Sequence, residues 1–163
     1  MSSNPSVPAI SILTSVFEVF CYTHDMKKVE SAGGVIINDA DEVVVVYTDT
    51  HSWQFPKGTV EENERYFDTA LREIEEETGL VDLEYIKDLP VYSRVSTHEE
   101  NTEREIHYFL FKTKRLDLNP SAEVTQCKWI PLQDVERQLT YSEDKEFIKQ
   151  VMQQGLLAVR DNG

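Results

Sequence analysis

The order of the expected elements predicts an α/β layered domain with a mixed β-sheet. Two observations support this fold class: β-prone segments lie both before and after one long amphipathic helix, and a second helix closes the chain. Strands and helices that alternate in this way pack as layers around a common core. At 163 residues the chain is long enough for a sizeable core and short enough to form one domain.

Residues 1–27 are expected to be an N-terminal extension of this domain. The stretch Ala9–Tyr22 is apolar but interrupted by polar side chains, and it is too short and too polar to span a bilayer. No Lys or Arg precedes it, as a signal peptide requires. We expect a packed strand or helix, or a contact between two copies of the chain, rather than a targeting signal.

The strand predictions rest on β-prone and alternating segments separated by turn residues. An apolar segment that opens with Gly33 and Gly34 is followed by a turn at 38–41 and an uninterrupted apolar run, which together predict a hairpin. The predicted strands cover residues 29–38, 43–47, 83–89, 91–95, 105–113 and 124–130. Polar loops are predicted at 96–103 and 116–123.

The long helix lies between the second and third predicted strands. Asn63 is expected to cap its start, and Gly79 follows its last turn, where a left-handed cap favours glycine. Pro131 can begin a short helix over 132–139. Ser142 is expected to cap a last helix that runs to Gln154.

Charge and cysteine content limit the partners and the compartment. The chain has 16 basic and 30 acidic residues, a net charge of −14, which argues against nonspecific binding to nucleic acid or to acidic membranes. A phosphorylated substrate stays possible, because bound metal ions neutralise a site locally. Cys21 and Cys127 form no disulfide framework, so we expect reduced thiols and a cytoplasmic protein.

One side of the long helix concentrates carboxylates beside its apolar face. At about 100° per residue, Glu73, Glu76 and Glu77 fall within one arc that adjoins the arc of Phe67 and Ile74. Like charges at helical spacing repel one another. Clustered carboxylate oxygens suit Mg²⁺ or Mn²⁺, although a solvated acidic face is the alternative when the helix is taken alone.

The residues around this face decide between the two interpretations. Residues 58–80 fit the pattern Gly-x5-Glu-x7-Arg-Glu-apolar-x-Glu-Glu-x-Gly-apolar without a break. This pattern resembles the signature of the Nudix hydrolases, and it is far more specific than a short glycine motif. The resemblance covers residues 28–155, leaving 156–163 as a C-terminal tail, and it implies the Nudix fold, a mixed sheet sandwiched between helices.

The resemblance also implies an activity and a set of roles. The expected reaction is hydrolysis of a nucleoside diphosphate linked to another group, by water that attacks a pyrophosphate phosphorus with Mg²⁺ or Mn²⁺ as cofactor. Glu73, Glu76 and Glu77 would bind the metal, and Glu76 or Glu73 would also deprotonate the water. Arg72 would hold those carboxylates by a fork-like pair, and Glu64 would orient that arginine or bind the metal through water. Gly58 would let the loop backbone approach phosphates and metal.

Short matches outside the signature suggest the substrate. Residues 53–58, 107–110 and 139–146 look most similar to asymmetric diadenosine tetraphosphate hydrolases, which implies a dinucleoside polyphosphate as the small phosphorylated partner. Lys57 would pair with a phosphate, Tyr108 would stack on a purine, and Trp53 would join the substrate site. For Tyr108 a place in the core is an equal alternative.

Glu123 is a further candidate outside the signature. It lies six residues before Trp129, and the diadenosine tetraphosphate hydrolases have a glutamate before a tryptophan at this spacing, on a loop that reaches the metal. This similarity implies a fourth metal ligand or a base at Glu123. A solvated loop glutamate is the alternative.

Three other functions stay open at this stage. Residues 53–58 are also similar to bacterial RNA 5′ pyrophosphohydrolases. Related enzymes dephosphorylate diphosphoinositol polyphosphates, but such dense phosphate needs many basic contacts, and only Lys27, Lys28, Lys57, Arg94 and Arg104 are candidates. A non-catalytic nucleotide-binding module is the alternative of another class, and no signature carboxylate is missing to support it. The sequence does not determine the oligomeric state.

Overall fold

The computed structural model describes residues 26–122 and 124–157, and within them the chain forms an eight-stranded mixed sheet. The strands are β1 (Lys27–Ile37), β2 (Glu42–Thr48), β3 (Trp53–Gln54), β4 (Lys57–Thr59), β5 (Glu84–Asp88), β6 (Tyr92–Val95), β7 (Thr102–Lys112) and β8 (Val124–Pro131). Along the sheet they are ordered β3-β2-β1-β7-β5, while β4, β6 and β8 pair with β1, β7 and β2.

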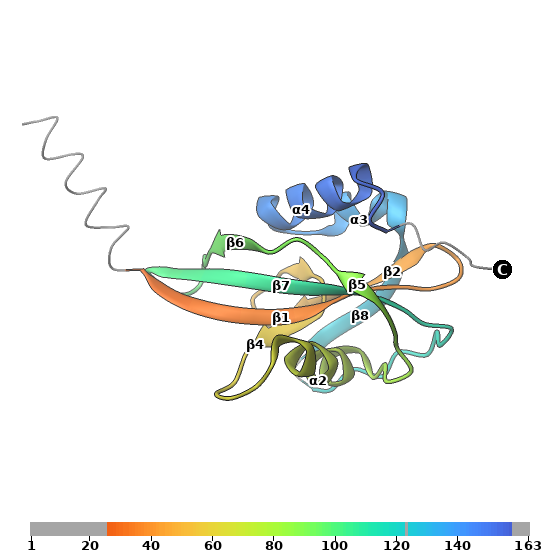
Figure 1. Cartoon of the computed structure of the whole chain (residues 1–163), viewed down its shortest axis with the longest axis horizontal. Coiled ribbons are helices and arrows are strands. Elements are labelled where there is room, and N and C mark those ends of the chain that lie inside the picture. Colours follow the sequence, from red (N-terminus) through yellow and green to blue (C-terminus); the bar gives the residue numbers. More distant parts are fainter. Residues whose placement is uncertain (1–25, 123, 158–163) are drawn as a thin grey trace, which may run out of the picture.

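Helices cover both faces of the sheet. Figure 1 shows α2 (Tyr66–Thr78) below the sheet, and α3 (Val135–Gln138) and α4 (Ser142–Gln153) above it. A 3₁₀ turn at Leu132–Asp134 leads from β8 into α3. The predicted α/β fold, a mixed sheet between helices, is confirmed.

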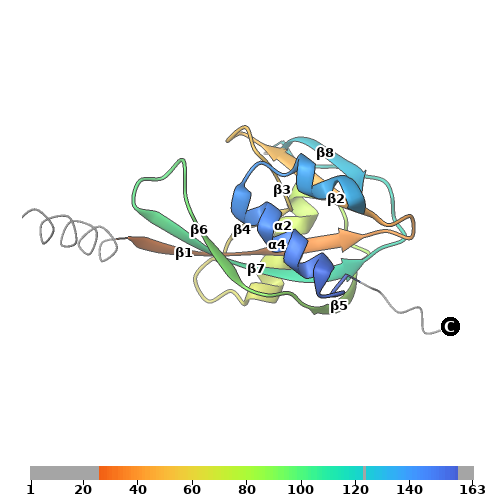
Figure 2. The ribbon, with the colours of Figure 1, turned by 90° about the horizontal axis from the view of Figure 1, so that it is seen from above.

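Alternate residues of the central strands supply two apolar cores. Ile36 and Val44 face α2, where they pack with Ile74 of that helix and with Leu80 and Phe111. Their neighbours in sequence, among them Val35 and Ile37, face the opposite side and pack under α3 and α4. Figure 2 shows α4 lying across this face of the sheet. Because side chains of a strand point alternately to its two faces, both layers are anchored by the same continuous apolar runs.

The position of β4 is set by β1. Strand β4 pairs antiparallel with β1, in the register Ser31–Thr59, Ala32–Gly58 and Gly33–Lys57. A Cβ at Gly33 would lie 2.1 Å from the carbonyl oxygen of Pro56, so only glycine admits the backbone before β4 at this distance. The signature glycine, Gly58, is therefore held within the sheet beside β1, where β4 contacts α2.

The longest pairing in the sheet joins strands that are distant in sequence. Strand β1 runs parallel to β7 from Lys27–Thr102 to Ile37–Lys112. Strand β7 begins three residues earlier than the predicted Glu105, because its first residues pair with β6, Val95 opposite Glu103. The predicted hairpin of β1 and β2 is present, with Ile37 opposite Val43.

Two predicted helix caps are wrong. Asn63 lies before the helix with φ 65°, and α2 begins at Tyr66 with Arg65 at its N-cap. The turn before α2 is closed instead by the Glu61 amide, which donates to the carboxylate of Glu64. Ser142 is already inside α4, and its hydroxyl donates to Glu143 rather than to a backbone amide. The predicted end of α2 is confirmed: Gly79 has φ 77° and its amide donates to Glu75.

The 27-residue extension lies largely outside the described residues, and so does Cys21. Across 26–122 and 124–157, no helix has the length and apolar character needed to cross a membrane.

Candidate functional site

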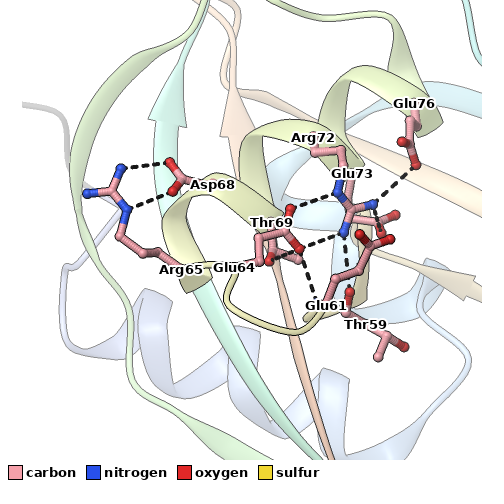
Figure 3. Close-up of polar contacts among 9 residues, drawn as sticks. All are labelled: Thr59, Glu61, Glu64, Arg65, Asp68, Thr69, Arg72, Glu73 and Glu76. Carbon is pink, nitrogen blue, oxygen red and sulfur yellow. Dashed lines mark hydrogen bonds and ion pairs between the residues drawn. The ribbon is translucent and has the colours of Figure 1, made fainter.

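Arg72 is the centre of a network of carboxylates along α2 (Figure 3). Its Nε and Nη2 donate to the two oxygens of Glu64 over 2.8 and 2.9 Å, so the fork-like pair is made with Glu64 rather than with the helix carboxylates for which it was predicted. Its Nη1 donates to Glu73 Oε1 over 2.6 Å and lies 3.5 Å from Glu76 Oε2. Its Nη2 also reaches the carbonyl oxygen of Thr59 in β4. Arg72 thus fixes the turn before α2, the helix and β4 relative to one another.

The charges of this network are strongly held. Hydrogen bonds from Arg72 and Thr69 lower the pKa of Glu64 to about 2. The bond to Glu64 raises the pKa of Arg72, against the effect of partial burial. Glu64 therefore stays an anion, and Arg72 a cation, throughout the physiological range.

Gly58 and Glu77 bring β4 and α2 together on the other side of Glu73. The carboxylate of Glu73 lies against the Cα of Gly58, in the space that a side chain would fill. Glu77 Oε2 accepts a hydrogen bond of 2.9 Å from the amide of Lys57. In the ranges 26–122 and 124–157, no three His, Cys, Asp or Glu side chains converge closely enough to hold a metal ion. Glu73 and Glu77 are instead bonded to Arg72 and to the Lys57 amide.

A cavity of about 580 Å³ opens beside Gly58 and Glu77. Lys57, Arg94 and Arg104 supply its basic groups. Loop residues 48–50 and 96–99 form its rim, and Gln54 and Tyr141 form part of its wall. Its volume is in the range of pockets that bind nucleotide-sized ligands. The signature residues Gly58 and Glu77 thus lie beside three basic side chains, in a cavity that also contains the carboxylates of Asp49 and Glu99.

Arg94 is held rigidly in the wall of this cavity. It is 7% exposed, and its Nη1 donates to Asp144 of α4 over 2.7 Å, while its Nη2 donates to Gln54 over 3.1 Å. The guanidinium lies 3.7 Å from the ring centre of Tyr141, and the hydroxyl of Tyr92 donates to the second oxygen of Asp144. A buried ion pair with additional hydrogen bonds is costly to break, because either charge alone would be left unpaired.

Lys57 is 8% exposed, although it lines the cavity. Burial, together with the nearby Arg94, lowers the pKa of its ammonium to about 8, against the opposing effect of Glu77. A buried ammonium without full compensation gains energy when an anion binds beside it.

Two predicted substrate residues lie elsewhere. Tyr108 is 1% exposed and packs in the core against Phe55, Tyr92 and Phe147, so its ring has no face available to a base. Trp53 does not line the cavity; it packs against Tyr47, and the Lys128 ammonium lies 4.3 Å from its ring centre. The prediction of base stacking at Tyr108 is wrong, because alternation along β7 turns this side chain toward α4. Glu123 lies outside the described residues.

Sequence reasoning missed Asp144 and Tyr141. Asp144 is fully buried, and it falls on the same helical face as the core residues Phe147, Ile148 and Val151. A charged residue at an apolar position of an amphipathic helix is a signal that was available, because such a charge needs a buried partner.

Comparisons with known proteins agree with this geometry. The model of the NUDIX domain matches residues 27–151. Nudix hydrolase 8 of Arabidopsis thaliana is 31% identical over 124 residues, which cover 71% of this chain and 32% of the relative. The RNA pyrophosphohydrolase of Bartonella henselae is 30% identical over 112 residues, which cover 56% of this chain and 65% of the relative. This chain thus spans between a third and two thirds of these relatives' length.

Solved structures share the fold. The crystal structure of a Caenorhabditis elegans Ap4A hydrolase in a binary complex aligns with a TM-score of 0.68 at 22% identity, covering 78% of this chain and 98% of the other. The NUDIX domain of Shewanella oneidensis NrtR, complexed with ADP ribose, aligns with a TM-score of 0.64 at 19% identity. With the NUDIX match over most of its length, this chain belongs to the Nudix family.

Proposed function

We propose that this chain is a pyrophosphohydrolase that cleaves a phosphoanhydride bond in a nucleoside diphosphate linked to another group, with diadenosine tetraphosphate, hydrolysed to ATP and AMP, as its preferred substrate. The observation that carries the proposal is the cavity that opens onto Gly58 and Glu77 and contains three basic side chains. The signature residues Gly58 and Glu77 line this space together with the basic side chains of Lys57, Arg94 and Arg104.

The donor set fits Mg²⁺ or Mn²⁺. Glu73, Glu76 and Glu77 offer only oxygen atoms, which hard divalent ions prefer, and Gly58 leaves the Glu73 carboxylate room beside the backbone. These residues, with Glu123 and the Gly58 backbone, would hold the ion. When bound, it neutralises phosphate oxygens and acidifies the attacking water.

The remaining roles belong to the chain itself. In this proposal Glu76 or Glu73 accepts a proton from water. The contacts of Arg72 with both carboxylates support the role, because they keep them on one side of α2. Lys57 holds a phosphate at the end of the cavity nearest Gly58. The stacked pair of Arg94 and Tyr141 gives the cavity a rigid wall.

A second candidate is removal of pyrophosphate from RNA 5′ ends, which is supported by the 30% identity to the Bartonella RNA pyrophosphohydrolase. The cavity is less suited to a diphosphoinositol polyphosphate. Two of its three basic side chains, Arg94 and Arg104, are already paired with Asp144 and Glu99. Dense phosphate needs several uncommitted basic groups.

A panel of substrates with Mg²⁺ tests the proposal. It contains diadenosine tetraphosphate, triphosphorylated RNA, a diphosphoinositol polyphosphate and an oxidised nucleoside triphosphate, with products separated by chromatography. We expect ATP and AMP from the dinucleotide at the highest kcat/KM. A clear preference for RNA or for the inositol compound contradicts the substrate, and no hydrolysis of any member contradicts the enzymatic activity.

A further inference from the structure

A second cavity, of about 490 Å³, shares two lining residues with the first, Glu99 and Arg104. Lys57 and Gly58 line the first cavity, and the following residues Thr59 and Val60 line the second. The other walls of the second cavity come from the start of β1, including Lys27, Lys28 and Val29. Each cavity has the size of a small-ligand pocket.

Glu99 and Arg104 line both cavities, and they are bonded to each other. Arg104 Nη2 donates to Glu99 Oε1 over 2.8 Å, and Arg104 Nη1 lies 3.5 Å from the hydroxyl of Thr59 in β4. Arg104 comes from β7, whereas Glu99 comes from the hairpin tip at 96–101. The ion pair therefore crosses the boundary between the two cavities.

Strand pairing explains why Arg104 needs an anion. Arg94 of β6 lies directly opposite Arg104 of β7 in the antiparallel register. Like charges in this arrangement destabilise a sheet. Asp144 neutralises Arg94 from inside the core, with both side chains at most 6% exposed, whereas Glu99 neutralises Arg104 from an exposed loop, with 48% of its side chain accessible. We infer that Asp144 is fixed beside Arg94, whereas Glu99 can be exchanged for another anion at Arg104.

We propose that the Glu99–Arg104 ion pair is an exchangeable barrier between the two cavities, at which Arg104 favours substrates with a long phosphate chain and Glu99 competes with them. A polyphosphate that extends past Lys57 displaces the Glu99 carboxylate from Arg104, and the far end of the substrate enters the second cavity. A substrate with two phosphates fills the first cavity and leaves the pair closed. This inference rests on the proposed function and names the substrate class as a group at each end of a chain of several phosphates.

Loss of the Glu99 charge tests the barrier. The variant is Glu99→Gln, and its control is Glu100→Gln, an equal charge change at the next position, which is exposed and lines neither cavity. With Glu99→Gln, the ratio of kcat/KM for diadenosine tetraphosphate to kcat/KM for a nucleoside diphosphate sugar should rise about twofold to fivefold, the scale of one exposed ion pair. Glu100→Gln should leave the ratio unchanged.

Arg104→Gln supplies the other half of a double-mutant cycle. It should lower the same ratio about tenfold, since a charged partner of the phosphate chain is lost. Glu99→Gln should have no further effect in that background, because its only proposed action is on Arg104. An equal response to Glu99→Gln and Glu100→Gln, or an equal change for both substrates, overturns the barrier.

Binding of methylene-bridged analogues, which resist hydrolysis, separates this inference from the proposed function. Calorimetry should show that Glu99→Gln lowers the Kd of the dinucleoside tetraphosphate analogue but leaves the Kd of the diphosphate analogue unchanged. If this shift occurs while no dinucleoside polyphosphate is hydrolysed, the barrier stands and the proposed activity fails. If the dinucleoside polyphosphate is hydrolysed with the same kcat/KM in Glu99→Gln and in Glu100→Gln, the proposed activity stands and the barrier fails.

Discussion

The carboxylate of Glu73 occupies the place where a side chain at position 58 would begin. A Cβ built on Gly58 would lie 2.0 Å from Glu73 Cδ and 2.0 Å from its Oε1. Contacts this short do not occur between non-bonded atoms. Gly58 is thus a glycine because of its neighbour in space, not because of its own backbone angle.

Gly58→Ala should therefore displace Glu73 from its place against β4. Since Glu73 is expected to bind the metal, we predict a fall in turnover of about 10²-fold or more, the usual scale for a group of this kind. The secondary structure, followed by circular dichroism, should persist. Turnover within about threefold of the parent would show that Glu73 can act from another position.

Removal of divalent cations should abolish turnover. The expected metal ligands are carboxylates that are presently bonded to Arg72 and to the Lys57 amide, and they offer no substitute for a cation at the phosphates. The measurement is substrate hydrolysis in excess chelator, followed by titration with Mg²⁺ or Mn²⁺. Full activity in chelator contradicts the metal requirement.

Glu76→Gln should lower turnover by about 10²-fold or more, because it keeps the shape of the side chain but removes its charge. Glu75→Gln is the matched control: Glu75 is exposed on the next position of α2 and lines none of the site. The two variants should have the same thermal midpoint. Equal turnover of Glu76→Gln and Glu75→Gln would show that Glu76 has no catalytic role.

Lys57→Met should stabilise the metal-free protein while it weakens phosphate binding. Burial lowers the pKa of Lys57 to about 8, so below that pH the folded state carries an ammonium at a cost on the order of 1–3 kcal/mol. The unfolded chain binds this proton more tightly. The stability of the parent should therefore rise toward that of the variant as pH increases from 8 through 10. Urea unfolding in chelator at several pH values measures this, and a less stable variant at pH 7 contradicts it.

Glu123→Gln should lower turnover at saturating metal and substrate, with little change in thermal stability. Helix α2 presents carboxylates from one side only, and Glu123, which precedes β8 in the sequence, would supply a carboxylate from outside this helix. The thermal midpoint and the metal dependence are measured together with turnover. Unchanged turnover and unchanged metal dependence would show that Glu123 takes no part in catalysis or metal binding.

The local pattern of apolar and polar residues was enough to predict α2 and most of the strands. The periodicity of Ile74 against Glu73 and Glu76 predicted which face of the helix is buried, and Gly79 predicted its end. The site is harder to predict, because it depends on contacts between distant segments. Nothing near Tyr108 in sequence reveals that Phe147 covers it, and nothing near Arg94 reveals Asp144. The basic residues can be read from the sequence, but which of them are held in ion pairs depends on contacts between segments that are distant in sequence.

The parallel pairing of β1 with β7 has a consequence for how the molecule is made. When β1 leaves the ribosome, the whole segment from β2 to β6 must still be synthesised before its long partner β7 exists. Until then, the apolar middle strand of the future sheet has an unpaired edge, which favours association between nascent chains. A chain truncated before β7 should accordingly be insoluble, and refolding from denaturant should be slow for a protein of this size, since its central contact is among the most distant in sequence.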